Sequence, residues 1–475
     1  MITRFLFISL LVLLSFGAQG QTSLTPSQWQ GQIGSVRLIL VIDATVASHS
    51  PTGHFESPDQ TEEHIPITDL RITADSLIAT APLIGGTFSS RFSPDQRSLV
   101  GVWQQGNASL PLTLRRLEKP VVKSKRPQTP VPPFPYRSDS VQYYNADKSI
   151  HFGATLTYPN PSHQPTRVGL PAVILITGSG PQDRDETVFR HKPFAVIADH
   201  LTRHGFAVLR VDDRGVGQTT GSFRQATSAD FANDVLASIA YLKTRSDIDA
   251  KKIGLIGHSD GGLVAPLVAV RSSDVAYIVS LAGVGVKGSE LLKKQIATSN
   301  RLEGMSPSAQ VATAQVMNAL IDRAADTALS TTRADLQAVY GHWKQTQPVD
   351  SLTSTGLTDQ SAKAFISSLL SPWMQYFLRY DPAPTLRKIR IPLLAMNGEK
   401  DYQVDATDNL SGFTTNLKKA GNKRYQIVSM PGLNHLFQTA STGGESEYAQ
   451  LEETFSPRAL TKMTEWLKEQ VGIKR

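Results

Sequence analysis

Residues 252–263 read KIGLIGHSDGGL, and the interpretation of the whole chain starts from them. A short apolar run, Ile253 to Ile256, ends abruptly at a glycine-rich turn, which predicts a strand, a sharp turn and a helix. Ser259 lies on the turn between Gly257 and Gly261, where larger side chains would collide with the strand and the helix. The pattern predicts that the Ser259 hydroxyl projects above the edge of a sheet, although Gly-x-Ser-x-Gly alone also occurs by chance in ordinary turns.

Two backbone amides are expected near that hydroxyl. The helix after the turn, from about Gly262 to Val270, directs its N-terminus at the same point, so the amide of Asp260 can stabilise an oxyanion. A second amide is expected from a glycine-rich loop after a predicted strand, GSGPQDRD at 178–185. Ser179 is the predicted donor and Gly180 its nearest rival, because glycines let a backbone approach a substrate carbonyl. The alternative is a merely flexible loop.

A nucleophilic serine needs an imidazole that takes its proton and an acid that orients the imidazole. Asp401 follows the predicted strand 393–397, and His435 follows the predicted strand 425–430. Both loops should open on the same edge of the sheet as Ser259, because functional loops of such sheets lie at the carboxyl ends of the strands. The chain order Ser, Asp, His is the one found in α/β-hydrolase sheets. The three residues are therefore predicted to form a catalytic triad.

Other ionisable residues near these positions are expected to have structural roles. Glu399, Asp405 and Asp408 are close to the predicted acid and are interpreted as solvated surface charges. His258 is adjacent to the serine, and its side chain is expected to point away from it. None of the four is predicted to take part in catalysis.

No metal and no cofactor is predicted. His200 and His204 lie four residues apart on a predicted helix, a spacing that can bind zinc, but no third ligand accompanies them. The chain has no cysteine, which excludes disulfides, thiolate catalysis and thiolate zinc sites. The glycine pattern DDRGVG at 212–217 is too weak for a dinucleotide site, and Arg214 within it is expected to pair with a carboxylate.

The N-terminus predicts export. Residues 1–20 combine Arg4, an apolar run from Phe5 to Phe16, and small residues before Gln21, which together predict a cleaved secretory signal and a periplasmic or secreted protein. The apolar run is shorter than the roughly 20 residues that a spanning helix needs. The mature chain is therefore expected to have no membrane span.

The formal net charge is +7, and much of the basic character is local to one linker. No stretch interleaves basic residues with aromatic ones on a folded face, so nucleic-acid binding is not predicted. A small-molecule substrate is the expected partner.

A β-rich N-terminal domain is predicted at residues 23–117. Short apolar runs between turn residues are typical of a small antiparallel barrel or sandwich. Trp29 and Trp103 could line a ligand-binding interior, although aromatic residues of a small β-domain usually form its core. Six prolines between Glu118 and Pro135 predict an extended, solvated linker at 118–137.

Residues 138–475 are expected to form one α/β domain. The predicted strands are mostly continuous apolar runs, which belong to strands buried on both faces of a largely parallel sheet. These strands are 149–158, 172–177, 207–212, 253–256, 277–281, 393–397 and 425–430. Residues rich in Ala, Gln, Leu and Ser interrupt the alternation between Gly283 and Pro384. They predict a helical cap at about 288–384 that shapes substrate access.

Four motifs resemble one known family. These are GSGPQDRDE at 178–186, DRGVG at 213–217, GHSDGG at 257–262 and GLNH at 432–435. They are similar to motifs of secreted bacterial serine hydrolases of the α/β-hydrolase superfamily, the group related to the Thermotoga esterase EstD, and the likeness covers most of the chain. The resemblance implies a triad of Ser259, Asp401 and His435, and carboxylesterase activity on short acyl chains.

The same resemblance implies oxyanion amides from Ser179 and Asp260. Asp260 stands where the family usually has Glu, and Thr177 stands where related hydrolases often have His. Because the oxyanion is bound by the backbone amide, activity is expected to survive the first of these differences.

Short-chain esters are the expected substrates in preference to peptides. An exopeptidase must hold a charged amino terminus, usually with carboxylates near the serine. The nearest acidic cluster here is Asp183, Asp185 and Glu186, and Arg184 and Arg190 are expected to neutralise it. Two alternatives stay open: a secreted serine peptidase, and a glycan- or lipid-binding protein whose hydrolase half is silent. The esterase and its alternatives share a triad or a fold, so the shape and chemistry of the pocket determine which of them applies.

Overall fold

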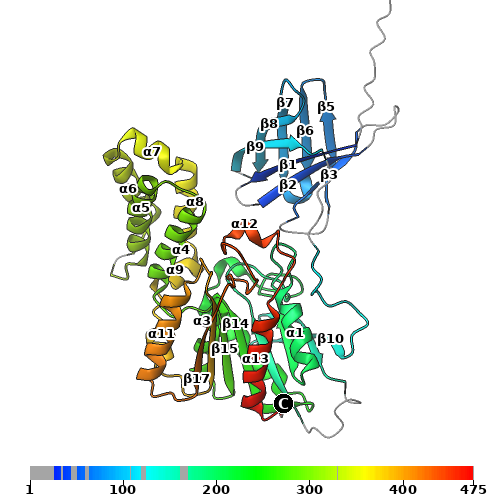
Figure 1. Cartoon of the computed structure of the whole chain (residues 1–475), viewed down its shortest axis with the longest axis vertical. Helices are drawn as coiled ribbons and strands as arrows, with labels where there is room; N and C mark the ends of the chain where they lie inside the picture. Colours follow the sequence, from blue (N-terminus) through cyan, green and yellow to red (C-terminus); the bar gives the residue numbers. More distant parts are fainter. Residues whose placement is uncertain are drawn as a thin grey trace, which may run out of the picture. The chain divides into compact units, whose positions relative to one another are not determined.

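The computed structural model describes residues 26–33, 36–43, 51–58, 64–106, 108–118, 125–160, 169–328 and 330–473 (Figure 1). The chain divides after residue 123 into two compact units. The predicted secretory signal, residues 1–20, lies outside the described residues. Within the described part of the chain, no helix combines the length and the apolar character needed to cross a membrane.

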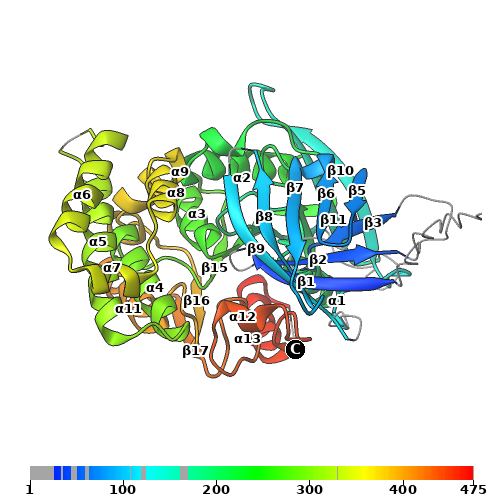
Figure 2. The same ribbon diagram turned by 90° about the horizontal axis from the view of Figure 1, so that it is seen from above.

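The N-terminal unit is a single antiparallel sheet that forms half a barrel (Figure 2). Its order is β4-β3-β2-β1-β9-β8-β7-β6-β5. The strands are β1 (Ser27–Ile33), β2 (Val36–Ile42), β3 (Gly53–Glu56), β4 (Ile65–Pro66), β5 (Asp69–Ile72), β6 (Ser76–Ala81), β7 (Gly86–Phe92), β8 (Ser98–Gln105) and β9 (Ala108–Arg116). The predicted all-β, barrel-like domain is confirmed. Strands β1, β3 and β4 were not predicted: polar residues hide the apolar alternation of β1 and β3, and β4 is only two residues long.

The two tryptophans of this unit belong to its core. Trp103 is buried edge-on against Phe55, with ring centroids 5.3 Å apart, and its indole donates to Gln105. Trp29 is buried edge-on against Phe92, and its indole donates to Ser27. Since burial and hydrogen bonding account for both rings, the interpretation of these residues as core is the one that the structure supports.

The second unit is an eight-stranded sheet covered by helices. Its order is β10-β11-β13-β12-β14-β15-β16-β17; β10–β11 and β11–β13 pair antiparallel, and all other neighbours pair in parallel. The strands are β10 (Arg137–Tyr144), β11 (His151–Tyr158), β12 (Leu170–Ile176), β13 (Ala207–Val211), β14 (Ile248–His258), β15 (Tyr277–Leu281), β16 (Leu393–Gly398) and β17 (Tyr425–Met430). The predicted, largely parallel α/β sheet is confirmed.

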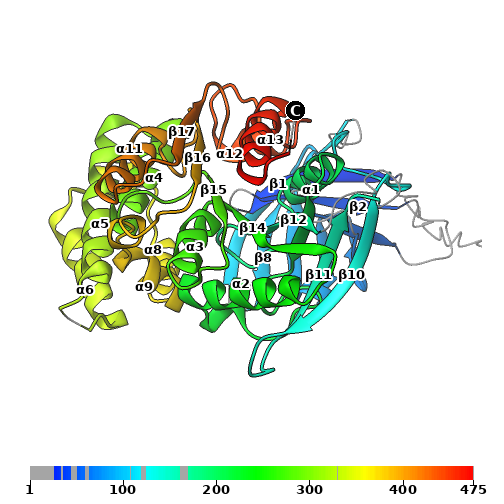
Figure 3. The same cartoon turned by 90° about the horizontal axis from the view of Figure 1, so that it is seen from below.

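Both faces of this sheet are buried, as its continuous apolar strands require. In β12, Ile174 and Ile176 face one side and Val173 and Leu175 the other, because side chains alternate along a strand. Three helices cover the first face and two cover the second (Figure 3). These are α2 (Ser228–Lys243), α3 (Asp260–Ala269) and α11 (Ala406–Lys419) on the first face, and α1 (Pro193–Arg203) and α13 (Pro457–Val471) on the second.

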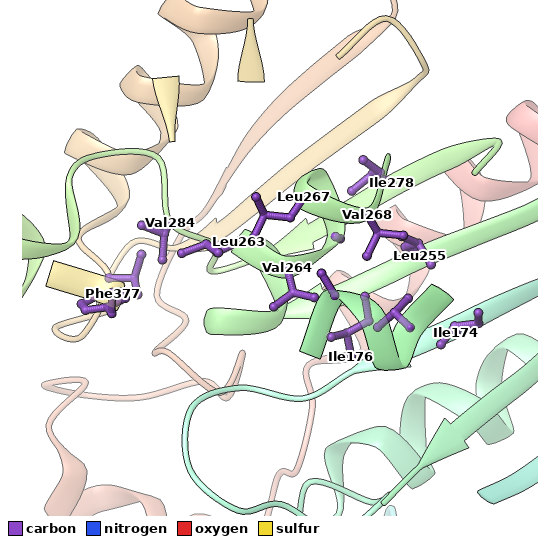
Figure 4. Packing of buried hydrophobic residues seen from close by; sticks show 14 of the residues in the cluster. Ile174, Ile176, Leu255, Leu263, Val264, Leu267, Val268, Ile278, Val284 and Phe377 are labelled. Atoms are coloured by element: carbon purple, nitrogen blue, oxygen red, sulfur yellow. The ribbon is translucent and has the colours of Figure 1, made fainter. Parts of the chain in front are cut away.

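Helix α3 is buried almost throughout, and this fixes the turn at its start. Figure 4 shows Val264 and Val268 of α3 gathered with Ile174, Ile176 and Leu255 of the strands. A helix so deeply embedded in the sheet face holds its first residues in one place. The N-terminus of α3 therefore stays at the carboxyl edge of β14.

Seven helices lie between β15 and β16, where the sequence predicts a cap. They are α4 (Gly288–Leu302), α5 (Pro307–Ala325), α6 (Arg333–Thr346), α7 (Val349–Thr355), α8 (Asp359–Leu369), α9 (Pro372–Arg379) and α10 (Ala383–Leu386). Capping boxes at Thr332 and Thr358 start α6 and α8. The helical cap insertion is confirmed.

The segment before β10 is held against the second unit over part of its length. The Arg126 guanidinium donates to the carbonyls of Phe189, Ala449 and Leu451, at 2.8–2.9 Å. Gln128 bonds the backbone of Phe455 through both its amide nitrogen and its oxygen. The prediction of a solvated tether is wrong for these residues, because three carbonyls of loop segments accept from Nη1 and Nη2 of one guanidinium.

Candidate active site

Ser259 occupies a strained turn between β14 and α3. Its φ is 53° and its ψ −115°, a conformation that is uncommon for a residue with a side chain and costs about 1–3 kcal/mol. Its amide donates to the Leu281 carbonyl at 2.9 Å, which ties the turn to β15. A Cβ on Gly257 would collide with the Gly261 backbone, and a Cβ on Gly261 would collide with the Ile176 carbonyl. Both glycines are therefore required sterically, as the sequence predicted.

The predicted acid and imidazole lie together. Nδ1 of His435 is 2.8 Å from Oδ2 of Asp401, and both side chains are almost fully buried. The other oxygen of Asp401 accepts the amides of Gln403 and Val404 at 2.9 and 2.8 Å. Because the Asp401 carboxylate acts as an acceptor, Nδ1 of His435 carries the proton of their shared bond. The Nε2 lone pair is then available to take a proton.

Asn397 also supports Asp401, and the sequence did not single it out. Its side-chain amide donates to Oδ2 of Asp401 at 3.1 Å and to the Val404 carbonyl at 2.9 Å. The only signal in the sequence is a polar residue at the end of an apolar strand. Asn397 closes the loop around the acid and fixes the carboxylate plane.

A buried pair, His258 and Glu186, connects the turn with two neighbouring loops. Nδ1 of His258 is 2.9 Å from Oε1 of Glu186, and Nε2 is 3.0 Å from the carbonyl oxygen of His435. The same Glu186 oxygen accepts the amide of Gly178 at 2.7 Å. Burial lowers the pKa of His258, but the Glu186 carboxylate outweighs it, together with the His435 carbonyl, and the pKa is raised overall. His258 therefore has a structural task there, because it bonds Glu186 and the His435 backbone.

The pairing predicted for the acidic cluster is wrong in part. Arg184 pairs with Asp212 at 2.6 Å, Asp185 pairs with Arg210, and Glu186 pairs with His258. Asp183 accepts from Asp185 and Thr187 of its own loop. Arg184 therefore forms its ion pair outside the predicted cluster. Arg214 pairs with Asp234 at 2.7 Å, which confirms the expectation of a carboxylate partner.

The glycine-rich loop after β12 is braced by Asp213. The Thr177 hydroxyl donates to one oxygen of Asp213 at 2.6 Å, and the Gln182 amide donates to the other at 3.0 Å. Burial raises the pKa of Asp213 to about 7, against the effect of these two donors. Thr177 thus supports the loop at the position where related proteins often have His. Gly178 packs against Ser259, since a Cβ on Gly178 would lie 3.3 Å from the serine Cβ.

Asp260 is the first residue of α3, so its amide is one of those without a partner inside the helix. Its buried carboxylate accepts the Ser228 hydroxyl at 2.9 Å and the Trp373 indole at 3.1 Å. Burial raises the pKa of Asp260 to about 6, and these two donors oppose the shift. Because Trp373 is on cap helix α9, the bond joins the cap to the residue after the serine.

A cavity of about 200 Å³ opens beside Ser259. Ser179 and Asp260 share its wall with the serine, so the structure brings both predicted oxyanion residues to one place. The rest of the wall is mostly apolar and comes largely from cap helices α4 and α9. It comprises Val284, Leu291, Leu292, Gln295, Trp373, Met374, Phe377, Gln403 and Val404.

The remaining candidates have structural roles. Asp405 caps α11 by accepting the Asp408 amide at 2.9 Å, and both carboxylates bind Lys294. Glu399 is exposed and accepts the Gly432 amide at 3.1 Å. His204 bonds the carbonyl of His200 at 2.7 Å, so the helical pair forms a local contact.

Three features together define an α/β hydrolase: the order of the strands, the strained turn that carries the serine, and the buried pair of acid and imidazole. The model of the alpha/beta hydrolase family matches residues 169–443, and the chain belongs to that family. It is 27% identical to esterase EstD of Thermotoga maritima over 268 residues, which are 56% of this chain and 54% of EstD. The match thus spans about half the length of that relative.

Solved esterase structures are similar to the chain as well. Est1E from Butyrivibrio proteoclasticus, with ferulic acid bound, is 17% identical and has a TM-score of 0.40, covering 70% of this chain and 99% of its own. Esterase Pf2001 of Pyrococcus furiosus is 15% identical with a TM-score of 0.42, covering 73% of this chain and 98% of its own.

Proposed function

We propose that the protein hydrolyses short-chain carboxylic esters through an acyl-enzyme on Ser259. The observation that carries the proposal is the buried bond between His435 and Asp401, in a site whose serine is held on a strained turn. That bond leaves Nε2 of His435 as the proton acceptor that a serine nucleophile requires. Family membership and the likeness to EstD support ester hydrolysis in general.

In the first half-reaction, the Ser259 oxygen attacks the ester carbonyl and passes its proton to Nε2 of His435. The amides of Ser179 and Asp260 donate to the oxyanion of the tetrahedral intermediate. The intermediate expels the alcohol, which takes the proton from His435 as the C–O bond breaks. In the second half, His435 activates a water that attacks the acyl group, and Ser259 regains its proton.

The size and lining of the cavity support a small acyl group. About 200 Å³ is less than the roughly 300–1,000 Å³ of pockets for drug-sized ligands. The walls from α4 and α9 are apolar apart from a few groups, and an acyl chain gains about 0.8 kcal/mol per buried CH₂ only while space remains. Acetyl to butyryl groups therefore suit the cavity best.

The carboxylate of Asp260 does not favour an amino-terminal peptide. Its hydrogen-bond donors, Ser228 and Trp373, are protein groups that already engage its oxygens. Amide cleavage also requires His435 to protonate the leaving nitrogen as the C–N bond breaks. An ester makes less strict demands on the same geometry.

The test is a panel of kcat/KM values on the purified chain. Acetyl, butyryl and octanoyl p-nitrophenyl esters are compared with aminoacyl and dipeptidyl p-nitroanilides. The proposal expects the acetyl and butyryl esters to be hydrolysed with the highest kcat/KM, and octanoyl ester at least tenfold more slowly. A kcat/KM for any aminoacyl or dipeptidyl anilide above that of the butyryl ester would identify a serine peptidase in place of an esterase.

A further inference from the structure

Three metal-ligating side chains converge on the N-terminal sheet, far along the sequence from the residues of the hydrolase site. His54 and Glu56 are two residues apart on β3, so they face the same side, while Phe55 between them is buried in the core. Strand β4 pairs with β3 antiparallel, with Ile65 opposite Phe55. His64, which precedes Ile65, therefore continues the register opposite Glu56 and joins the other two.

The three ligand atoms have the spacing of a coordination sphere. Oε1 of Glu56 lies 3.5 Å from Nε2 of His54 and 3.3 Å from Nε2 of His64. All three atoms lie within 4.8 Å of one another. A charge-assisted N–H···O bond would be about 2.7–2.9 Å long. Tetrahedral zinc, with bonds of about 2.0–2.2 Å, separates neighbouring ligands by roughly 3.4 Å, which matches both distances.

Hydrogen bonding does not satisfy His54. Nε2 of His54 is buried and has no hydrogen-bond partner. The rings of His54 and His64 are stacked, with centroids 3.9 Å apart and planes inclined by 10°. Two imidazolium ions so close would repel each other, whereas metal ligation uses the neutral imidazole. A cation bound by the two Nε2 atoms and the carboxylate would supply the partner that His54 lacks. Because an imidazole lone pair lies in the plane of its ring, the exposed His64 ring would turn out of the stack to face the ion.

We propose that His54, Glu56 and His64 bind one divalent transition-metal ion. Two imidazoles and one carboxylate are typical zinc ligands, and a water would complete the tetrahedron. The His64 side chain is 56% exposed, which gives the ion a path from solvent, while Glu56 and His54 are largely covered. The ion would join β3 to β4 at one end of the sheet, so its effect is to stabilise the N-terminal unit. This site is independent of the proposed ester hydrolysis.

The experiment titrates Zn²⁺ into the full chain, purified without a histidine tag and stripped with a chelator, by calorimetry. We expect one equivalent to bind with micromolar or tighter Kd, and His64→Ala to weaken it at least a hundredfold. His64 is exposed and outside the strands, so this variant should keep the fold, which circular dichroism checks. His342→Ala, at an exposed histidine of α6, is the matched control and should bind as the parent does.

A second readout is the melting temperature of the N-terminal unit. Zinc at a hundredfold excess over Kd should raise the melting temperature in the parent chain and leave that of His64→Ala unchanged, because an ion that binds only the folded state stabilises it. Glu56→Gln should behave as His64→Ala does. Absence of binding below about 100 µM, or binding that His64→Ala leaves intact, would overturn the site.

Discussion

Glu186 holds three parts of the site through a single carboxylate oxygen. That oxygen accepts from Gly178 in the glycine-rich loop and from His258 beside the nucleophile, and His258 in turn bonds the His435 backbone. Because the carboxylate raises the pKa of His258 above its usual value, it favours the doubly protonated ring that can donate at both nitrogens. The pair therefore positions the imidazole loop without touching substrate.

Glu186→Gln should lower kcat by about ten- to a hundredfold with little change in KM. Gln keeps an acceptor for Gly178, but it removes the charge, so burial lowers the pKa of His258. A neutral ring donates at only one nitrogen, so one of its two bonds to Glu186 and the His435 carbonyl is weakened or lost, at about 1–3 kcal/mol. Glu399→Gln, at an exposed glutamate that also accepts a backbone amide, is the control. Histidine NMR should show the His258 pKa falling in Glu186→Gln, and an unchanged pKa with unchanged kcat would contradict this role.

The same pair gives a pH dependence of stability. A histidine whose pKa is raised in the folded state stabilises the fold fully below its unfolded pKa of about 6.5 and loses this contribution as pH rises through the folded pKa. The stability difference between the parent chain and Glu186→Gln, measured by denaturant unfolding, should therefore be largest below about pH 6.5 and shrink as pH rises through the raised pKa of His258.

Asp260 predicts a pH dependence of stability in the same direction, but in a lower pH range. Its pKa, raised from 3.8 to about 6 by burial, means that stability is fully present below the unfolded pKa and is lost as pH rises through about 6. Asn at this position cannot ionise. Between about pH 4 and pH 6 the parent should lose up to about 3 kcal/mol relative to Asp260→Asn, measured by denaturant unfolding. A difference that stays constant across this range would show that Asp260 ionises normally.

Among single residues, the sequence predicted those that lie in recognisable turns. It missed those whose role depends on a contact between segments far apart in the chain. Ser259, Asp401 and His435 each follow a strand in a characteristic loop, so position along the chain was sufficient to nominate them. Glu186 and His258 are 72 residues apart, and nothing in their spacing indicates a contact. Their pairing depends on how two loops meet at the sheet edge, which only the folded chain specifies.

Two cap helices, α4 and α9, contribute most of the wall of the Ser259 cavity. Leu291, Leu292 and Gln295 come from α4, and Trp373, Met374 and Phe377 come from α9. The composition of the insertion predicted helices, but not which of them face the serine. That choice depends on tertiary packing, which composition does not specify. The bond between Trp373 and Asp260 adds a polar link that fixes α9 over the site.

Met374→Ala should shift the acyl preference toward longer chains. Removing three heavy atoms from the cavity wall adds space for about two methylenes, so kcat/KM for hexanoyl and octanoyl esters should rise several-fold relative to acetyl. Val311→Ala, at an exposed position of α5, is the matched control and should leave the profile unchanged. An acyl-length profile in Met374→Ala identical to that of the control would show that α9 does not limit the acyl group.

Across the whole molecule, the sequence predicted one β-rich unit and one α/β unit with its cap. The continuous apolar strand β15 was located to the residue, because burial on both faces leaves an unambiguous pattern. Strand β10 was missed, since its half-exposed residues alternate weakly and it follows the proline-rich segment. The contacts of Arg126 with three carbonyls were likewise not predicted, because the proline-rich composition of its segment is typical of a solvated tether.

Export of the whole protein stays a prediction. The basic start, the apolar run from Phe5 to Phe16 and the small residues before Gln21 favour cleavage after Gly20. N-terminal sequencing of the protein recovered from its native host should begin at Gln21, in a fraction outside the cytoplasm. Recovery of a cytoplasmic chain that retains Met1 would refute it.

The central claim is that Ser259 is the nucleophile, and active-site labelling tests it most directly. A fluorophosphonate should modify the parent chain at one site, and peptide mass spectrometry should locate the adduct on Ser259. Ser259→Ala should take up no label and lose on the order of 10⁴ or more in kcat toward butyryl ester, while keeping the fold. An adduct on another residue, or near-parental activity in Ser259→Ala, would contradict the account.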